Sequence, residues 1–218
     1  MGGDERRERL AGARLYFVCD SAPAGRPLGD LLDAALLGGV DVVQLRDKTA
    51  DDAALLRAAA TFRAAADSHQ ALFILNDRPD LVRPTAADGV HVGQEDEDLD
   101  AVRDAVGTDH LIGLSTHTPA QFDAGASGTA DYLSAGPVHT TPTKPGRPAT
   151  GLALIRHAAE LDPKPWFAIG GIDSGTAGAV VAAGAARLVV VRAIRNAPDP
   201  LGAARELRTA LGAKADVG

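Results

Sequence analysis

The sequence predicts an α/β protein that folds as a single (β/α)8 barrel. Eight short apolar runs alternate with Ala- and Leu-rich stretches that are typical of helices. Such continuous apolar strands suit a parallel sheet covered by helices, and eight strands close this barrel. The length of 218 residues suits one such domain. A doubly wound open sheet is the alternative, but the sequence has neither G-x-G-x-x-G after a strand nor G-x-x-x-x-G-K-[ST].

The elements follow in order from these patterns. Residues 1–12 form a charged lead-in, 13–212 the barrel and 213–218 a tail. Thr118-Pro119 and Asp199-Pro200 each predict a helix start, and Gly39, Gly107 and Gly184 lie where helices would stop. We interpret segment 137–150, rich in Pro, Thr and Gly, as a functional loop that acts as a lid. The expected strands are 14–20, 41–47, 71–77, 89–94, 111–116, 131–138, 166–172 and 187–194.

Composition narrows the classes of function. The formal net charge of −7 argues against a general nucleic-acid surface, although an anionic small molecule remains possible if cations gather in one cleft. Cys19 is the only cysteine, so no internal disulfide can form, which suits a reducing cytosol. The lead-in has no apolar core of signal-peptide length, and no later run is long enough for a membrane span. We expect a cytoplasmic protein that binds small molecules; the oligomeric state stays open.

Polar residues gather where the predicted strands end. Active sites of these barrels lie at the carboxyl ends of the strands, so the fold predicts that these side chains form one ring. In chain order they are Gln44, Arg46 and Lys48; Asn76, Asp77 and Arg78; His91, Gln94, Glu95 and Asp96; Ser115, Thr116 and His117; Thr140, Thr141, Thr143 and Lys144; Gly170 and Gly171; and Arg192.

Part of this ring has the composition of a diphosphate site. Arg46, Lys48 and Lys144 supply positive charge from two loops. Asp77 and Asp96 follow neighbouring strands, and carboxylates without His or Cys partners suit Mg²⁺ bound together with substrate phosphates. Asp77 can alternatively cap a helix that begins near Pro79, and Glu95 or Glu97 can take the place of Asp96.

A second anion site is indicated by Gly170-Gly171 and by residues 190–192. The loops after the seventh and eighth strands of these barrels often hold a phosphate on backbone N–H groups, which glycine lets approach closely. Two phosphorylated substrates, one with a diphosphate leaving group, indicate a transferase that displaces pyrophosphate.

The motifs "QLRDK", "NDRPDL", "GVHVGQED", "GLSTHT", "GPVHTTPTKPGRP" and "IGGI" together resemble the thiamine-phosphate synthase family over residues 40–195. The resemblance implies a (β/α)8 barrel and Mg²⁺. It implies that 4-amino-2-methyl-5-hydroxymethylpyrimidine diphosphate is joined to 4-methyl-5-hydroxyethylthiazole phosphate, giving thiamine phosphate and pyrophosphate. It also implies a dissociative mechanism, in which pyrophosphate leaves before the thiazole nitrogen captures the pyrimidine-methyl cation.

The resemblance assigns roles residue by residue. It implies that Asp77 and Asp96 bind Mg²⁺, and that Arg46, Lys48, Lys144 and Ser115 are catalytic. The implied pyrimidine-diphosphate contacts are Gln44, Leu45, Arg46, Asp47, Lys48, Asn76, Ser115 and Lys144. The implied thiazole-phosphate contacts are Thr141, Pro142, Thr143, Gly171, Val191 and Arg192.

Departures from the family pattern leave alternatives open. Many members have serine where this chain has Arg192, and an aromatic residue with proline where it has His139-Thr140. Arg192 can reach the phosphate by its side chain or bind through its backbone. A thiazole tautomerase of similar sequence and a non-catalytic phosphate-ligand sensor are the rival functions, and the paired aspartates favour the synthase.

For three residues in or near the ring, the sequence favours a structural role over a functional one. Within "RDK", Asp47 is the residue most easily explained without a ligand. His91 alternates with valines and is interpreted as a packed strand residue, and Cys19 as a small buried residue rather than a nucleophile.

Overall fold

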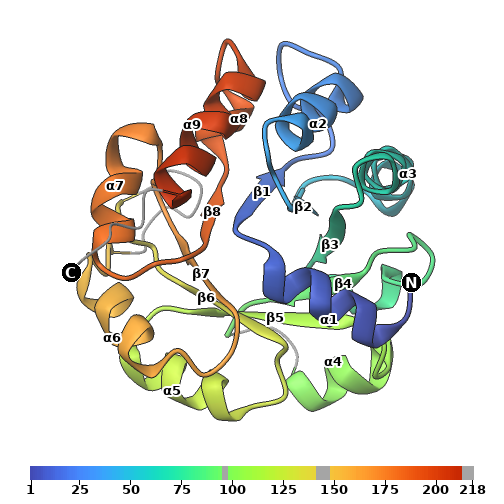
Figure 1. The fold of residues 1–218 in the computed structure, drawn as a ribbon. Helices are drawn as coiled ribbons and strands as arrows, with labels where there is room; N and C mark the ends of the chain where they lie inside the picture. The colour runs from blue at the N-terminus through green and yellow to red at the C-terminus, as the bar shows by residue number, and fades with distance from the viewer. Residues whose placement is uncertain (95–97, 141–147, 213–218) are drawn as a thin grey trace.

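Eight parallel strands form a closed barrel in sequence order, from β1 to β8 and back to β1, in a computed structural model (Figure 1). The structure describes residues 1–94, 98–140 and 148–212. The predicted fold class is confirmed, and each predicted strand contains an observed one. The strands are β1 (Leu15–Cys19), β2 (Val42–Leu45), β3 (Leu72–Asn76), β4 (Gly89–Val92), β5 (Leu111–Thr116), β6 (Tyr132–Ala135), β7 (Trp166–Ile169) and β8 (Leu188–Val190).

Helices pack around the outside of the barrel (Figure 1). The Thr118 side chain accepts a hydrogen bond from the Gln121 N–H and so caps the helix that begins at Pro119, as predicted. The helices are α1 (Gly3–Gly12), α2 (Leu28–Leu37), α3 (Asp52–His69), α4 (Leu99–Val106), α5 (Pro119–Ser127), α6 (Ala153–Leu161), α7 (Ser174–Ala182), α8 (Arg192–Arg195) and α9 (Pro200–Gly212).

The connection from β3 to β4 departs from the β-α repeat. It contains only a short 3-10 helix, η1 (Pro79–Leu81), where the repeat predicts an α-helix. Few residues separate these strands, and two of them, Pro79 and Pro84, have no N–H to donate. Arg78, not Asp77, occupies the N-cap position of η1, and no side chain caps it.

Strand residues alternate between two separate apolar cores. One core lies between the barrel and its helices and includes Phe17, Val43 and Phe73. The other fills the barrel and includes Tyr16, Ile74, Tyr132 and Phe167. Because successive strand residues face opposite sides of a sheet, this alternation determines which side chains reach the barrel interior.

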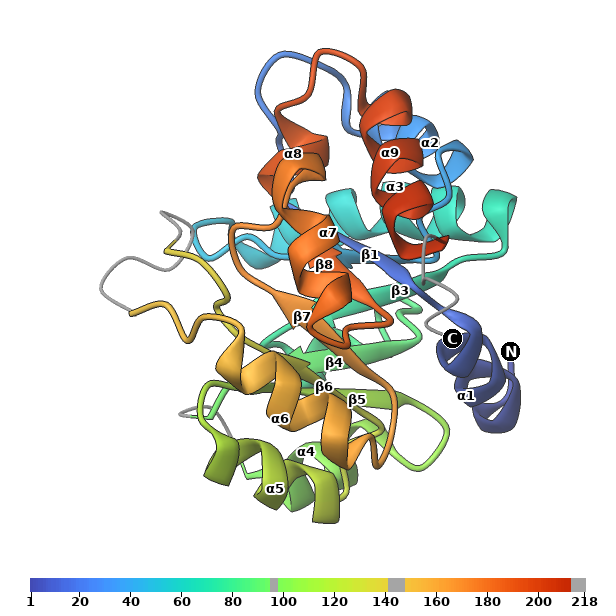
Figure 2. The ribbon, with the colours of Figure 1, turned by 60° about the vertical axis from the view of Figure 1, so that its left-hand side comes forward.

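Helix α1 closes the amino-terminal end of the barrel, away from α8 at the other end (Figure 2). Leu10 packs into the inner core, and Arg6 and Arg7 form ion pairs with Asp88 and Asp131, next to the starts of β4 and β6. The charged lead-in is therefore a docked helix, and the barrel can open to solvent at its carboxyl end. Within the described ranges, no helix combines the length and the apolar composition needed to cross a bilayer.

Candidate active site

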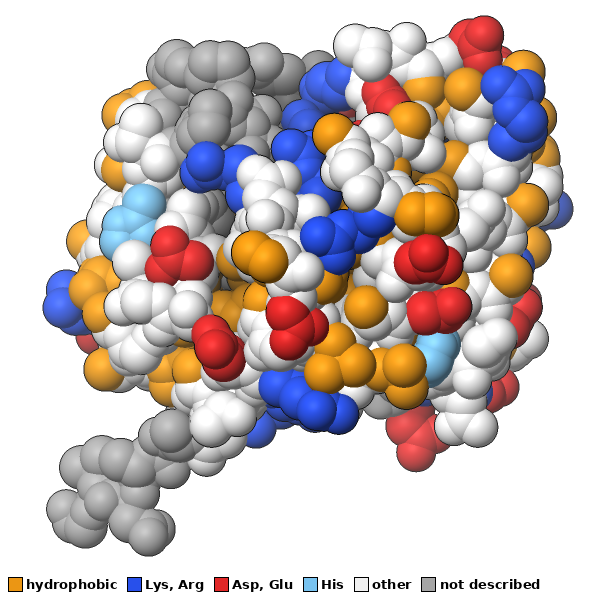
Figure 3. All heavy atoms as spheres, turned by 90° about the horizontal axis from the view of Figure 1, so that it is seen from above, with side chains coloured by type: hydrophobic (Ala, Val, Ile, Leu, Met, Phe, Trp, Pro, Cys, Tyr) orange, Lys and Arg blue, Asp and Glu red, His pale blue; other side chains and the backbone are white. Residues whose placement is uncertain are grey.

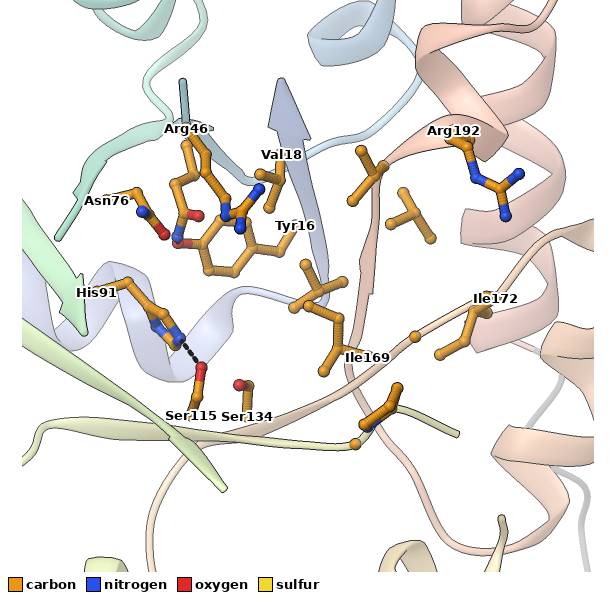
Figure 4. A pocket seen from close by; sticks show the side chains of 18 of the residues that line it. Tyr16, Val18, Arg46, Asn76, His91, Ser115, Ser134, Ile169, Ile172 and Arg192 are labelled. Carbon is orange, nitrogen blue, oxygen red and sulfur yellow. Dashed lines mark hydrogen bonds between the residues drawn. The ribbon is translucent and has the colours of Figure 1, made fainter. Parts of the chain in front are cut away.

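A cavity of about 680 Å³ opens at the carboxyl ends of the strands (Figure 4). Side chains at the ends of β2, β3, β4, β5 and β6 project into it, and the loops after β7 and β8 complete its wall. On the face seen in Figure 3, basic and acidic side chains are interspersed, so positive charge there is local rather than extended. Of the predicted site residues, the structure brings the following to the cavity: Gln44, Arg46, Lys48, Asn76, Asp77, Ser115, Gly171, Val191 and Arg192.

The other predicted site residues divide into two groups. The Leu45 side chain is buried in the outer core, and the Asp47 carboxylate is taken up by its own loop, so neither lines the cavity. The remaining ones lie outside the described residues: Asp96, Thr141, Pro142, Thr143 and Lys144.

Lys48 and Asp77 lie side by side at the cavity. The Lys48 Nζ is 3.5 Å from Asp77 Oδ2, and the two side chains are 63% and 28% exposed. Asp77 has φ of 58°, a left-handed conformation that aspartate tolerates better than most residues, and its N–H donates to the His91 carbonyl at 2.9 Å. This backbone turn carries the carboxylate from the end of β3 to the cavity rather than to a helix cap.

Asp47 holds the loop on which Arg46 and Lys48 stand. Its carboxylate accepts hydrogen bonds from the Ser21 hydroxyl at 2.5 Å and the Ser21 N–H at 3.3 Å, in the loop after β1. It also accepts from the N–H and hydroxyl of Thr49 and from the Ala50 N–H. These hydrogen bonds, the Ser21 hydroxyl first, lower the pKa of Asp47 well below its usual range. Asp47 thus ties two neighbouring loops together.

A chain of hydrogen bonds crosses the floor of the cavity. Gln44 Nε2 donates to the Tyr16 hydroxyl at 2.6 Å, and the hydroxyls of Tyr16 and Tyr132 are 3.1 Å apart. The Tyr132 hydroxyl is 3.1 Å from His91 Nδ1, and His91 Nε2 is 2.9 Å from Ser115 Oγ (Figure 4). We call these five residues the floor chain. It joins two predicted pyrimidine contacts, Gln44 and Ser115, through residues buried in the barrel.

The opposite wall is mainly backbone. Gly170 and Gly171 have φ of 109° and 66°, and a Cβ on Gly170 would lie 2.4 Å from the Pro137 Cα. Only glycine fits this conformation and this approach of the β6 and β7 loops. Val191 and Arg192 follow β8, and Arg192 lies across the cavity from Arg46 (Figure 4). A glycine-rich backbone wall beside the Arg192 cation is suitable for an anion.

Cys19 and Asp20, at the end of β1, also line the cavity. Asp20 pairs with Arg195, and its other carboxylate oxygen is buried without a hydrogen-bond partner in the described part of the chain. Burial, with the neighbouring Asp20 charge, raises the pKa of the Cys19 thiol to about 12. Cys19 is therefore a neutral buried thiol, as its interpretation from sequence expects.

The interpretation of His91 as a packed strand residue is incomplete. The side chain is buried, but it faces the barrel interior and lines the cavity. His117 also lines it and contacts the Gly136 carbonyl through Nδ1 at 2.6 Å. His139 does not line the cavity, and its Nε2 has no hydrogen-bond partner within the described ranges.

Sequence reasoning missed Tyr16, Tyr132 and Ser134. Each lies on the interior side of its strand, level with a residue that the sequence did predict or two residues from that level. Ser134 is the register partner of Ser115. Tyr16 is two residues before Val18, which is the register partner of Gln44. A count of interior positions by twos from each strand end would have found them.

The Asp77 carboxylate at the cavity fits a hard divalent cation. Asp77 presents oxygen and is the one predicted metal ligand that the structure describes. No group of three or more His, Cys, Asp or Glu residues gathers for a metal within the ranges described. A site of one or two carboxylates that needs substrate phosphates to complete it is the arrangement that Mg²⁺ prefers.

Comparisons with known proteins identify the family of this chain. A family model described as thiamine monophosphate synthase matches residues 15–194. The thiamine-phosphate synthase of Mycobacterium bovis is 49% identical over 216 residues, covering 94% of this chain and 97% of the relative. That of Streptomyces avermitilis is 48% identical over 205 residues, covering 93% and 95%. The solved structure of thiamine phosphate pyrophosphorylase from Pyrococcus furiosus superimposes with a TM-score of 0.84 at 29% identity, covering 94% and 97%. The chain belongs to the thiamine monophosphate synthase family.

Proposed function

We propose that this protein is a transferase that makes thiamine phosphate. It joins 4-amino-2-methyl-5-hydroxymethylpyrimidine diphosphate to 4-methyl-5-hydroxyethylthiazole phosphate and releases pyrophosphate. The observation that carries the proposal is the convergence of a cationic side, an amide and hydroxyl floor and a glycine-rich wall on one cavity, in a chain of this family. The identity of the two substrates and the order of the reaction steps are what we infer.

The cationic side suits the diphosphate. Arg46 offers forked N–H donors and Lys48 a mobile ammonium to the phosphate oxygens, with Lys144 from the loop outside the described residues. Their positive charge favours the state in which negative charge grows on the departing pyrophosphate. Asp47 holds Arg46 and Lys48 ready for this task by fixing their loop.

Asp77, with Asp96, is proposed to hold Mg²⁺. Bound there, the ion would neutralise part of the charge on the diphosphate. Lys48 then has two anionic neighbours, the Asp77 carboxylate that it contacts at 3.5 Å and the substrate, and its exposed side chain can move between them.

The floor is proposed to hold the pyrimidine, with Gln44, Asn76 and Ser115 as its polar contacts, and the glycine-rich wall the thiazole phosphate. On that wall, Gly171, Val191 and Arg192 act together with Thr141, Pro142 and Thr143. We infer that pyrophosphate leaves first and that the thiazole nitrogen then forms the new bond to the methylene carbon. The aminopyrimidine donates electron density to this cationic carbon, so no protein nucleophile is needed, and the Cys19 thiol is held protonated.

The test is pyrophosphate release by the purified protein with each substrate alone and with both, in Mg²⁺ and then in EDTA. We expect release to need both substrates and the metal, with thiamine phosphate appearing in equal amount. Asp77→Asn should lose at least about 100-fold in kcat. Asp80→Asn, a nearby exposed carboxylate paired with Arg78, serves as the matched control and should keep full activity. Bound substrates without any release would refute the proposal and favour a sensor or a tautomerase.

A further inference from the structure

Donation along the floor chain can run from Gln44 to Ser115. Gln44 Nε2 donates to the Tyr16 oxygen, and we infer that the one hydroxyl hydrogen of Tyr16 is given to Tyr132. The Tyr132 hydrogen then points to His91 Nδ1, which accepts it. His91 therefore carries its hydrogen on Nε2 and donates to Ser115 Oγ. Burial raises the pKa of both tyrosines, so each phenol keeps its proton.

This direction determines what each end of the chain offers to the cavity. The Ser115 oxygen already accepts from His91, and its own hydrogen remains to be donated. Gln44 has used an N–H on Tyr16, and its carbonyl oxygen has no hydrogen bond to a residue within the described ranges. The floor thus presents a donor from β5 and an acceptor from β2. An aminopyrimidine has the complementary pair, a ring nitrogen that accepts and an amino group that donates.

The middle of the chain is built into the barrel rather than into the cavity wall. The Tyr132 side chain is fully buried and does not line the cavity. Gly113 makes room for its meeting with His91, because a Cβ there would lie 2.1 Å from the Tyr132 ring and 2.4 Å from His91 Nδ1. A side chain at this interior position of β5 would break the chain at its centre.

We propose that Tyr132 is a positioning residue that acts on the pyrimidine through His91 and Ser115. By donating to Nδ1, Tyr132 fixes the His91 tautomer that carries its hydrogen on Nε2. His91 then donates to Ser115, which leaves the Ser115 hydrogen to bind the aminopyrimidine in one orientation. This inference deepens the proposed function and rests on it for the identity of the ligand. The direction of the chain itself does not depend on any activity.

The direction is tested first, by NMR of ¹⁵N-histidine-labelled full-length protein at about pH 8, where an ordinary histidine is neutral. The His91 signals are assigned by their loss in His91→Gln. We expect a protonated Nε2 and an unprotonated Nδ1, and in Tyr132→Phe a shift of the Nδ1 resonance as its donor disappears. An Nδ1-protonated His91 in the wild type reverses the chain and overturns the proposal, whether or not the protein couples its substrates.

The coupling to Ser115 is tested by a double-mutant cycle on kcat/KM for the pyrimidine diphosphate. Tyr132→Phe should lower it about tenfold, the effect of one lost hydrogen bond, and leave KM for the thiazole phosphate unchanged. In a Ser115→Ala background the same substitution should change it less than about twofold. Equal losses in both backgrounds, or no loss in the wild type, would overturn the role.

A packing control separates positioning from stability. Ile74→Val removes one buried heavy atom from the same inner core, as Tyr132→Phe does, without touching the floor chain. We expect it to lower Tm by a comparable amount and to leave kcat/KM unchanged. A loss of kcat/KM equal to that of Tyr132→Phe would refute positioning in favour of general packing. If the wild-type protein has the expected His91 tautomer but does not join the two substrates, the proposed function is rejected and the direction of the floor chain is not.

Discussion

Replacing Asp47 by alanine tests whether a residue outside the cavity governs the cations inside it. Its carboxylate accepts five hydrogen bonds, two from Ser21 and three from Thr49 and Ala50. Asp47→Ala therefore frees the loop after β2 from the loop after β1, together with the two cations that flank position 47.

The magnitude follows from this geometry. The carboxylate is partly exposed, so water replaces much of each bond, and about 0.6 kcal/mol for each of the five gives a loss of about 3 kcal/mol in the free energy of unfolding. Because the folded pKa of Asp47 is depressed, this contribution is present above the unfolded pKa of about 3.9 and is lost as the pH falls through the folded value. The difference between wild type and variant should thus be constant near neutral pH and shrink only in acid. Misplacement of Arg46 and Lys48 should lower kcat/KM by about 10- to 100-fold.

The assay uses the single tryptophan. Trp166 is buried in β7, so its fluorescence reports unfolding in urea, while pyrophosphate release reports kcat/KM. Asp51→Ala is the matched control: Asp51 stands in the same connection and caps α3 by accepting from the Ala54 N–H, so it should lose about 1 kcal/mol and keep its activity. The reasoning is refuted if Asp47→Ala retains full kcat/KM, or if it is no less stable than Asp51→Ala.

Three further predictions concern other parts of the molecule. Asp77→Asn should change the free energy of unfolding by less than about 1 kcal/mol, because asparagine also tolerates the left-handed backbone, while coupling activity is lost; marked unfolding in a urea titration would mean a structural role. Asp88→Ala should cost about 3 kcal/mol in the same titration, because the buried carboxylate is the shared partner of Arg6 and Arg63; a loss below about 1 kcal/mol would contradict this. Cys19, with its pKa raised to about 12, should resist iodoacetamide at about pH 8 in the folded protein and react after unfolding, as mass spectrometry would show.

The barrel was predictable because local signals agree with one another. Eight apolar runs, the Thr118 cap and the glycine stops each depend on near neighbours in the chain, and all indicate the same alternation. The meeting of Gln44, Asn76 and Ser115 at one cavity was predictable because the carboxyl ends of parallel strands meet at one end of a barrel.

The floor chain was not predictable in the same way. Its members are 28, 116, 41 and 24 residues apart along the chain, pair by pair, and come from four strands besides β1. The direction of each hydroxyl depends on all the others, so no single motif contains it. Asp47 shows the same limit, because its strongest partner, Ser21, lies 26 residues away in another loop.

Docking of α1 has a consequence for how the chain reaches its final state. Arg6 and Arg7 pair with residues 82 and 124 positions later, and the carbonyl of Ala13 accepts from Arg187, 174 positions on. On the ribosome, α1 therefore emerges well before Asp88, Asp131 and Arg187 and must wait for these partners. Until then, Leu10 has no inner core to enter. Helix α1 is thus made before the barrel that it closes, and it settles only after the strands that supply its partners.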